Sequence, residues 1–114
     1  MTNKYGDIRF IHFADDFREV PLDGGATVAY LVDFSGTVTY ATSICSRSDK
    51  FTKEYGRNRS AGLLVQYMNT APEIKNGLDD LRSGRYRGSV ADIADMMDQH
   101  GYVARRVLDI PAPV

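Results

Sequence analysis

Residues 27–44, with the sequence TVAYLVDFSGTVTYATSI, decide the fold of this 114-residue chain. The arms Thr27–Asp33 and Thr37–Ile44 are rich in β-branched and aromatic residues, which favour strands. The short connector between the arms ends in Gly36, and glycine adopts the positive φ that a tight hairpin turn needs. The stretch therefore predicts an antiparallel β-hairpin.

The two faces of this predicted hairpin differ in the size of their side chains. Successive residues of a strand point to opposite faces. One face carries the larger and more apolar side chains: Val28, Tyr30, Val32, Val38, Tyr40, Thr42 and Ile44. The other face carries small, partly polar side chains: Thr27, Ala29, Thr37, Thr39 and Ala41. The first face predicts a hydrophobic core, whereas the second face is either covered as well or forms a binding surface.

The segments around the hairpin add further strands and helices. Asp7–Phe13 alternates like a strand, Ala14–Gly25 is predicted as a loop, and Tyr102–Val107 is predicted to rejoin the sheet. Three stretches begin with Ser or Thr followed three residues later by Asp or Glu, a capping box that marks a helix start. The predicted helices span residues 46–69, 70–84 and 89–101.

A run of strands followed by a run of helices favours an α+β fold over alternating α/β. The length of the chain suits one domain with one core. We therefore predict a single α+β domain over residues 1–114. Its expected architecture is a small antiparallel sheet built on the central hairpin, with about three helices packed on it.

Composition and charge argue against several classes of protein. The chain has 14 basic and 15 acidic residues, and this net charge of -1 provides no overall field for nucleic acid or membranes. The single cysteine precludes an intramolecular disulfide. No apolar run approaches the roughly 20 residues that span a bilayer, and residues 1–7 lack the apolar core of a signal peptide. We therefore expect a cytoplasmic protein with no membrane partner.

The spacing of histidine, cysteine and acidic residues matches no catalytic or metal-binding pattern. The patterns C-x-x-C, H-x-x-x-H and H-E-x-x-H are absent, so we expect neither a metal nor another cofactor. His12 is interpreted as a half-buried strand residue and His100 as a cation that favours a helix end. Cys45 precedes a predicted helix start, which would lower its thiol pKa. A small buried residue is the favoured interpretation of Cys45, so we expect a protein that is not an enzyme.

The local charge pattern is more informative than the total charge. The first predicted helix and the residues before it carry five basic residues: Arg47, Lys50, Lys53, Arg57 and Arg59. A second basic cluster surrounds an aromatic residue: Arg82, Arg85, Tyr86 and Arg87. Such a surface suits either nucleic acid or an acidic protein face, and a merely solvated helix is the third interpretation. Acidic residues recur on the last predicted helix, and this segregation of charge favours docking of a protein partner.

One segment resembles part of the small uncharacterised accessory proteins that tailed phages and prophages encode. The pattern C-S-x-x-D-x-F-x-x-x-x-G-R, followed by a small residue and a glycine, is matched by Cys45, Ser46, Asp49, Phe51, Gly56, Arg57, Ala61 and Gly62. Leu63 departs from the pattern, in which an arginine often follows the second glycine. The resemblance covers about a third of the chain and carries no activity. It implies the company of phage accessory genes, whose small products often bind and disable a host machine.

These observations predict a non-enzymatic phage or prophage accessory protein that binds a host protein or ribonucleoprotein in the bacterial cytoplasm. Inhibition of a defence system, in the manner of an anti-CRISPR protein, falls within this expectation. The predicted contacts are Arg47, Lys50, Lys53, Arg57, Arg59, Arg85, Tyr86 and Arg87. The first alternative is a nucleic-acid binding module that uses the basic helix 47–59. The second is an enzyme with Cys45 as its nucleophile.

Overall fold

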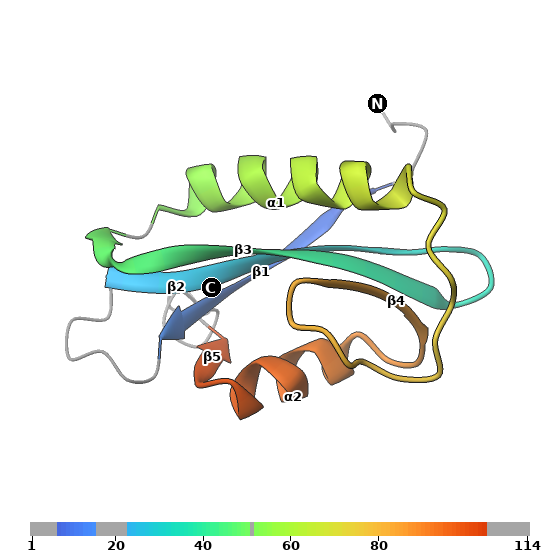
Figure 1. The fold of residues 1–114 in the computed structure, drawn as a ribbon. Coiled ribbons are helices and arrows are strands. Elements are labelled where there is room, and N and C mark those ends of the chain that lie inside the picture. Colours follow the sequence, from blue (N-terminus) through green and yellow to red (C-terminus); the bar gives the residue numbers. More distant parts are fainter. Residues whose placement is uncertain (1–6, 16–22, 51, 105–114) are drawn as a thin grey trace, which may run out of the picture.

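A five-stranded antiparallel sheet separates two helices in the computed structural model, which describes residues 7–15, 23–50 and 52–104 (Figure 1). The elements in chain order are β1 (Arg9–Asp15), β2 (Asp23–Val32), β3 (Thr37–Lys50), α1 (Lys53–Met68), β4 (Ser83–Arg87), α2 (Ala91–Gln99) and β5 (Tyr102–Ala104). The strand order in the sheet is β4-β3-β2-β1-β5, and all neighbouring strands are antiparallel. The predicted α+β class and antiparallel sheet are confirmed.

The predicted hairpin is formed by β2 and β3 at the centre of the sheet. Tyr30 lies opposite Tyr40, so the faces that the sequence predicts are also the faces of the sheet. At the turn, the Gly36 N–H donates to the Asp33 carbonyl over 3.0 Å, and Gly36 has a φ of +83°. The Asp33 carboxylate strengthens the turn because it accepts hydrogen bonds from the Ser35 hydroxyl and from the Thr37 backbone N–H.

Each face of the sheet carries its own hydrophobic layer. Beneath the sheet, the large residues of the hairpin pack with α2 in a layer that includes Phe13, Val28, Val38, Tyr40, Tyr86, Ile93 and Met97. Above the sheet, α1 covers the small residues, and this layer contains Ala29, Leu31, Ala41 and Leu64. The face whose role the sequence left open is therefore a covered face (Figure 1).

Helix α1 approaches the sheet closely at its first turn. Gly56, Ser60 and Leu64 are its buried residues and recur every four positions, which places them on one side of a helix. A Cβ on Gly56 would lie 2.1 Å from the Thr27 hydroxyl oxygen, so only glycine fits at this contact. Thr27 also shares a hydrogen bond of 2.9 Å with His12 Nδ1. Small residues on both elements therefore set the distance between helix and sheet.

The predicted start of the first helix at residue 46 is wrong. Residues through Lys50 continue β3, and the helix begins at Lys53, after Thr52. The long-range pairing of Lys50 with Asp23 outweighs the capping box of Ser46 and Asp49, since such local signals are worth only about 1 kcal/mol. The helix ends at Met68, close to the predicted end at residue 69.

The predicted helix over residues 70–84 is also wrong, and the described chain contains two helices in place of three. Residues 71–82 form a loop, and Gly84, the predicted helix end, lies inside β4. Ala71 has a φ of +50°, and Pro72 follows it, so the chain leaves the helical conformation at this point. Leu78 and Leu81, the predicted helical stripe, still pack against the lower hydrophobic layer.

The last predicted helix and the strand after it are confirmed. Ser89 and Asp92 form the predicted capping box: the Ser89 hydroxyl accepts from the Ala91 N–H, and Asp92 accepts from the Ser89 N–H. Helix α2 ends before Gly101, and β5 pairs with β1 at the edge of the sheet. The predicted residues of β5 beyond Ala104 lie outside the described chain.

Candidate binding cleft at the sheet edge

Strand β4 is much shorter than its neighbour β3. It pairs with β3 only from Thr37 to Ala41, whereas β3 continues to Lys50. The last contact between these two chain segments is a hydrogen bond of 2.7 Å from the Thr42 N–H to the Arg82 carbonyl. Beyond that bond, no described strand pairs with the outer side of β3.

A cleft of about 480 Å³ opens where β4 stops, and we call it the edge cleft. Its lining comes from β3, from α1 and the turn after it, and from the start of β4. The lining residues are Ala41, Thr42, Ser43, Ile44, Arg59, Leu63, Gln66, Tyr67, Thr70, Arg82 and Ser83. The volume is within the range of small-ligand and side-chain pockets.

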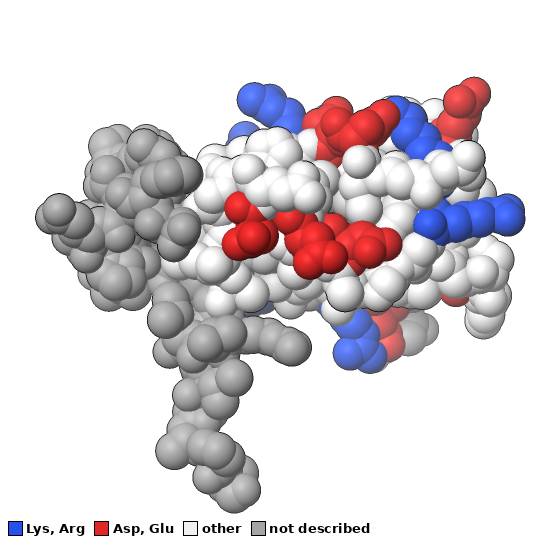
Figure 2. All heavy atoms as spheres, turned by 90° about the horizontal axis from the view of Figure 1, so that it is seen from below, with Lys and Arg blue, Asp and Glu red and all other residues white. Residues whose placement is uncertain are grey.

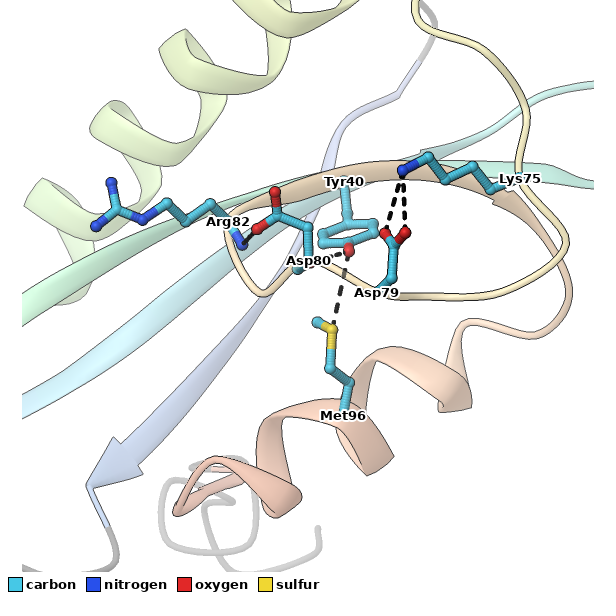
Figure 3. Close-up of polar contacts among 6 residues, drawn as sticks. All are labelled: Tyr40, Lys75, Asp79, Asp80, Arg82 and Met96. Carbon is cyan, nitrogen blue, oxygen red and sulfur yellow. Dashed lines mark hydrogen bonds and ion pairs between the residues drawn. The ribbon is translucent and has the colours of Figure 1, made fainter.

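Two arginines from different elements line the edge cleft. Arg59 comes from α1 and Arg82 from the residue just before β4, and both are exposed. Within the described chain, neither guanidinium forms an ion pair. Figure 3 shows the Arg82 side chain extending away from Asp79 and Lys75. The edge cleft therefore offers two positive charges that form no ion pair with an acid of the described chain.

The acidic residues nearest Arg82 in sequence have other partners. The Asp79 carboxylate pairs with Lys75 Nζ at 3.0 Å, and this contact raises the pKa of Lys75 (Figure 3). The Asp80 carboxylate accepts a hydrogen bond of 2.9 Å from the backbone N–H of Arg82, and the Asp80 carbonyl accepts one from the Tyr40 hydroxyl. These contacts hold the loop against the sheet and leave the Arg82 guanidinium free of them.

Neutral polar groups complete the edge cleft. The Thr70 hydroxyl donates to the Tyr67 carbonyl over 2.6 Å, which fixes the turn after α1. Burial raises the pKa of Tyr67, so this phenol stays protonated and can donate a hydrogen bond. The Thr42 hydroxyl oxygen is buried and makes no hydrogen bond within the described structure. Two guanidinium groups beside the protonated Tyr67 phenol suit an anionic group such as a carboxylate or a phosphate.

The basic residues predicted on the first helix do not form one surface. Arg47 and Lys50 belong to β3, and the structure does not describe their side chains. Lys53, Arg57 and Arg59 are exposed on α1. Arg57 and Arg59 are two positions apart, about 200° around a helix, so they point to opposite flanks. Of the predicted contacts, only Arg59 lines the edge cleft, and no continuous basic helix 47–59 exists.

The second predicted cluster is divided in a similar way. Tyr86 is 1 % exposed and belongs to the core, where its hydroxyl donates to the Ser89 carbonyl, so it is not a surface residue. Arg85 is half-buried, lies 3.6 Å from the Asp33 carboxylate and contacts the Pro72 carbonyl. Arg87 is exposed. Arg82, the cluster's remaining member, is the one at the edge cleft.

The opposite side of the molecule carries negative charge. Figure 2 shows acidic side chains gathered over the face on which α2 lies. Helix α2 contributes Asp92, Asp95 and Asp98, and the latter two are exposed. Carboxylates of α2 therefore lie beneath the sheet, whereas Arg59 and Arg82 lie at the edge beside α1.

The remaining candidate residues have structural surroundings. His12 bonds Thr27, and His100 Nδ1 donates to the Met96 carbonyl at the end of α2, so both rings make contacts within the fold. Cys45 is partly buried in β3, and α1 begins only at Lys53, so the expected proximity of Cys45 to a helix start is wrong. The part of the chain that the structure describes contains no group of three or more His, Cys, Asp and Glu side chains arranged for a metal ion.

Sequence reasoning predicted Arg59 as a contact and named Arg82 only as a member of the basic cluster around Tyr86, and it did not identify the cleft. Thr42 and Ser43 read as ordinary strand residues, and Gln66 and Tyr67 carried no motif. Recognition of the cleft depends on the length of β4, which the sequence did not predict.

Among the described residues, no helix is both long enough and apolar enough to cross a membrane. No protein-family model, curated protein or solved structure matches this chain.

Proposed function

We propose that this chain is a non-enzymatic binding protein that recognises an anionic segment of a partner protein at the edge cleft. One observation carries the proposal: Arg59 and Arg82, from two separate elements, line the same cleft and lack ion pairs within the described chain. Arginine binds carboxylates through paired hydrogen bonds, and such charge-assisted bonds are stronger than neutral ones.

The proposed class of partner rests on the sequence resemblance. A phage or prophage accessory protein in the bacterial cytoplasm would engage a host protein or ribonucleoprotein, including a defence complex that it inhibits. This origin rests on the segment from Cys45 to Gly62 alone. Supporting contacts from Lys53 and Arg87 stay predictions of the same proposal, whereas Arg57, on the opposite flank of α1 from Arg59, is left outside it.

The proposal is tested by capture of partners from a bacterial lysate with the tagged protein. The informative variant is the double charge reversal Arg59→Glu/Arg82→Glu, because both residues are exposed and neither stabilises a described contact through its side chain. We expect a roughly 10- to 100-fold loss of affinity, which corresponds to one or two charge-assisted contacts. Partner binding that persists unchanged in the double variant overturns the proposal.

The matched control is Arg57→Glu, a charge reversal on the opposite flank of α1. We expect near-wild-type capture with this variant. An equal loss with Arg57→Glu would assign recognition to a wider basic surface rather than to the edge cleft. A parallel capture after nuclease treatment tests the nucleic-acid alternative, since recovery of nuclease-sensitive material alone would favour that function and phosphate contacts would give a steep dependence on salt.

A further inference from the structure

The edge cleft runs along the side of a strand rather than over one face of the sheet. Four consecutive residues of β3, Ala41 to Ile44, line it. Consecutive strand residues point alternately to the two faces, so a cleft that contacts all four must lie beside the backbone. Arg82 and Ser83, at the start of β4, line the same cleft. The edge cleft therefore occupies the track that β4 would follow if it were longer.

The backbone of β3 is suited to receive another strand at this point. The Thr42 N–H points outward, because it donates to the Arg82 carbonyl across the edge. Backbone direction alternates along a strand, so the N–H and carbonyl of Ile44 are directed to the same side. No described strand pairs with β3 there. An uncovered strand edge is a template for pairing with another chain.

The outer edge of β4 is covered, in contrast to the edge of β3 at the cleft. The outer side of β4 is covered by the loop before it: the Lys75 N–H donates to the Arg85 carbonyl over 2.7 Å, and the Arg87 N–H donates to the Lys75 carbonyl over 3.1 Å. The strand edge beside the two free arginines has no such cover in the described structure.

We propose that the partner segment binds as an added antiparallel strand on β3, in line with β4, and that its acidic side chains meet Arg59 and Arg82. This inference rests on the proposed function and specifies the partner as an extended acidic peptide segment. Strand addition takes its affinity from backbone hydrogen bonds and its specificity from alternate side chains. The positive charge of the edge cleft favours acidic side chains in the partner segment. The strand edge of β3 favours an extended conformation of that segment.

The register of β3 defines the pattern of the bound segment. A residue opposite Ser43 lies on the face that α1 covers, where Arg59 stands, so this position takes Asp or Glu. A residue opposite Ile44 lies on the other face, and Ile44 is 41 % exposed, so this position takes an apolar side chain that covers it. Acidic and apolar residues therefore alternate in the expected ligand.

Selection from a random octapeptide library, displayed and presented to the purified full chain, provides the probe. We expect enrichment of proline-free peptides in which acidic and apolar residues alternate. The enriched sequences are expected to lose binding to Arg59→Glu/Arg82→Glu and to keep it with Arg57→Glu. Nitrogen-15 NMR of the full chain with a synthetic enriched peptide is expected to shift the amide signals of Ser43, Ile44 and Thr42 the most.

Backbone N-methylation of that peptide, one position at a time, tests strand addition directly. Methyl groups on amides that face β3 are expected to lower affinity at least tenfold, whereas methyl groups on the alternate amides leave it nearly unchanged. If every N-methylated peptide binds equally well, or if the amide signals shift only on another surface, strand addition is overturned. The proposed function would still stand in that case, provided that binding depends on Arg59 and Arg82. If affinity falls only for peptides methylated at every second amide, but does not depend on Arg59 and Arg82, the proposed function is overturned instead. A library that yields no binding peptide contradicts strand addition.

Discussion

The two faces of the sheet are packed in different ways, although the same strands form both. Beneath the sheet, large side chains such as Tyr40 and Phe13 fill the space to α2. Above it, the helix approaches so closely that Gly56 touches Thr27, and the sheet presents small residues such as Ala29 and Ala41 to the helix. The packing of the lower face depends on large side chains that fill the space to α2. The packing of the upper face depends on the missing side chain of Gly56, which lets α1 approach Thr27. Substitutions that enlarge or reduce a side chain should therefore have opposite consequences on the two faces.

The largest expected effect is Tyr40→Ala on the lower face. Tyr40 is fully buried, stacks edge-on against Tyr86 with ring centroids 6.0 Å apart, and bonds the Asp80 carbonyl. Truncation of a buried aromatic residue costs about 3–5 kcal/mol of unfolding free energy. Urea denaturation measures this loss. The control Tyr40→Phe removes only the hydroxyl and should cost about 1 kcal/mol; equal losses in the two variants would contradict a volume-dependent lower face.

The second effect separates two glycines of α1. Gly56→Ala places a methyl group against Thr27 and should cost about 1–3 kcal/mol. Gly62→Ala meets no atom within 4 Å on the exposed side of the helix and should stabilise the protein by up to about 1 kcal/mol. Thermal denaturation of both variants checks the signs. Stabilisation by Gly56→Ala would mean that α1 does not lie as close to the sheet as described.

A smaller effect concerns the hairpin turn that joins β2 and β3, the strands that contribute to both faces. The Ser35 hydroxyl and the backbone N–H groups of Thr37 and Ser35 donate to Asp33 and hold the pKa of its carboxyl below the ordinary 3.8. A lowered pKa in the folded state means that Asp33 contributes stability above pH 3.8, and that this contribution is lost as the pH falls below it. Asp33→Asn should therefore flatten the pH dependence of stability in this acidic range. An unchanged profile by urea denaturation would show that the carboxylate does not stabilise the turn.

The smallest expected effect on stability belongs to the edge cleft. Arg59→Glu/Arg82→Glu should change the unfolding free energy by less than about 0.5 kcal/mol per residue, since exposed side chains without ion pairs contribute little. Urea denaturation of the double variant checks this value. A loss of several kcal/mol would assign these arginines to the fold and would weaken their assignment to binding.

The elements that sequence predicted correctly carry their signals locally. The β2–β3 hairpin combines β-branched alternation with a turn glycine, and α2 combines a satisfied capping box with an apolar stripe. The prediction failed where distant segments compete with a local signal. Ser46 and Asp49 resemble a helix cap, but the residues that flank them, Cys45 and Lys50, pair with β2 and keep this segment in β3.

The candidate site was harder to predict than the fold for the same reason. Strand β4 contains one large apolar residue, Tyr86. Gly84 of the same strand packs against the Tyr40 ring of β3, where a Cβ would lie 2.7 Å away. Neither feature is visible without the neighbouring strand. Because β4 was not predicted, its short pairing with β3, which stops at Ala41 and Ser83, was not predicted either. Arg59 and Arg82 could therefore not be placed in one cleft.

The most direct test of the binding assignment is photo-crosslinking in bacterial cells from one position on each side of the sheet. Gln66 lines the edge cleft and Gln99 lies at the end of α2, and both are exposed, so a photoreactive residue at either position is compatible with the fold. The edge-cleft assignment predicts a crosslinked partner from position 66 that disappears with Arg59→Glu/Arg82→Glu, and none from position 99. A partner crosslinked from position 99 alone would contradict it and move recognition to the acidic face of α2.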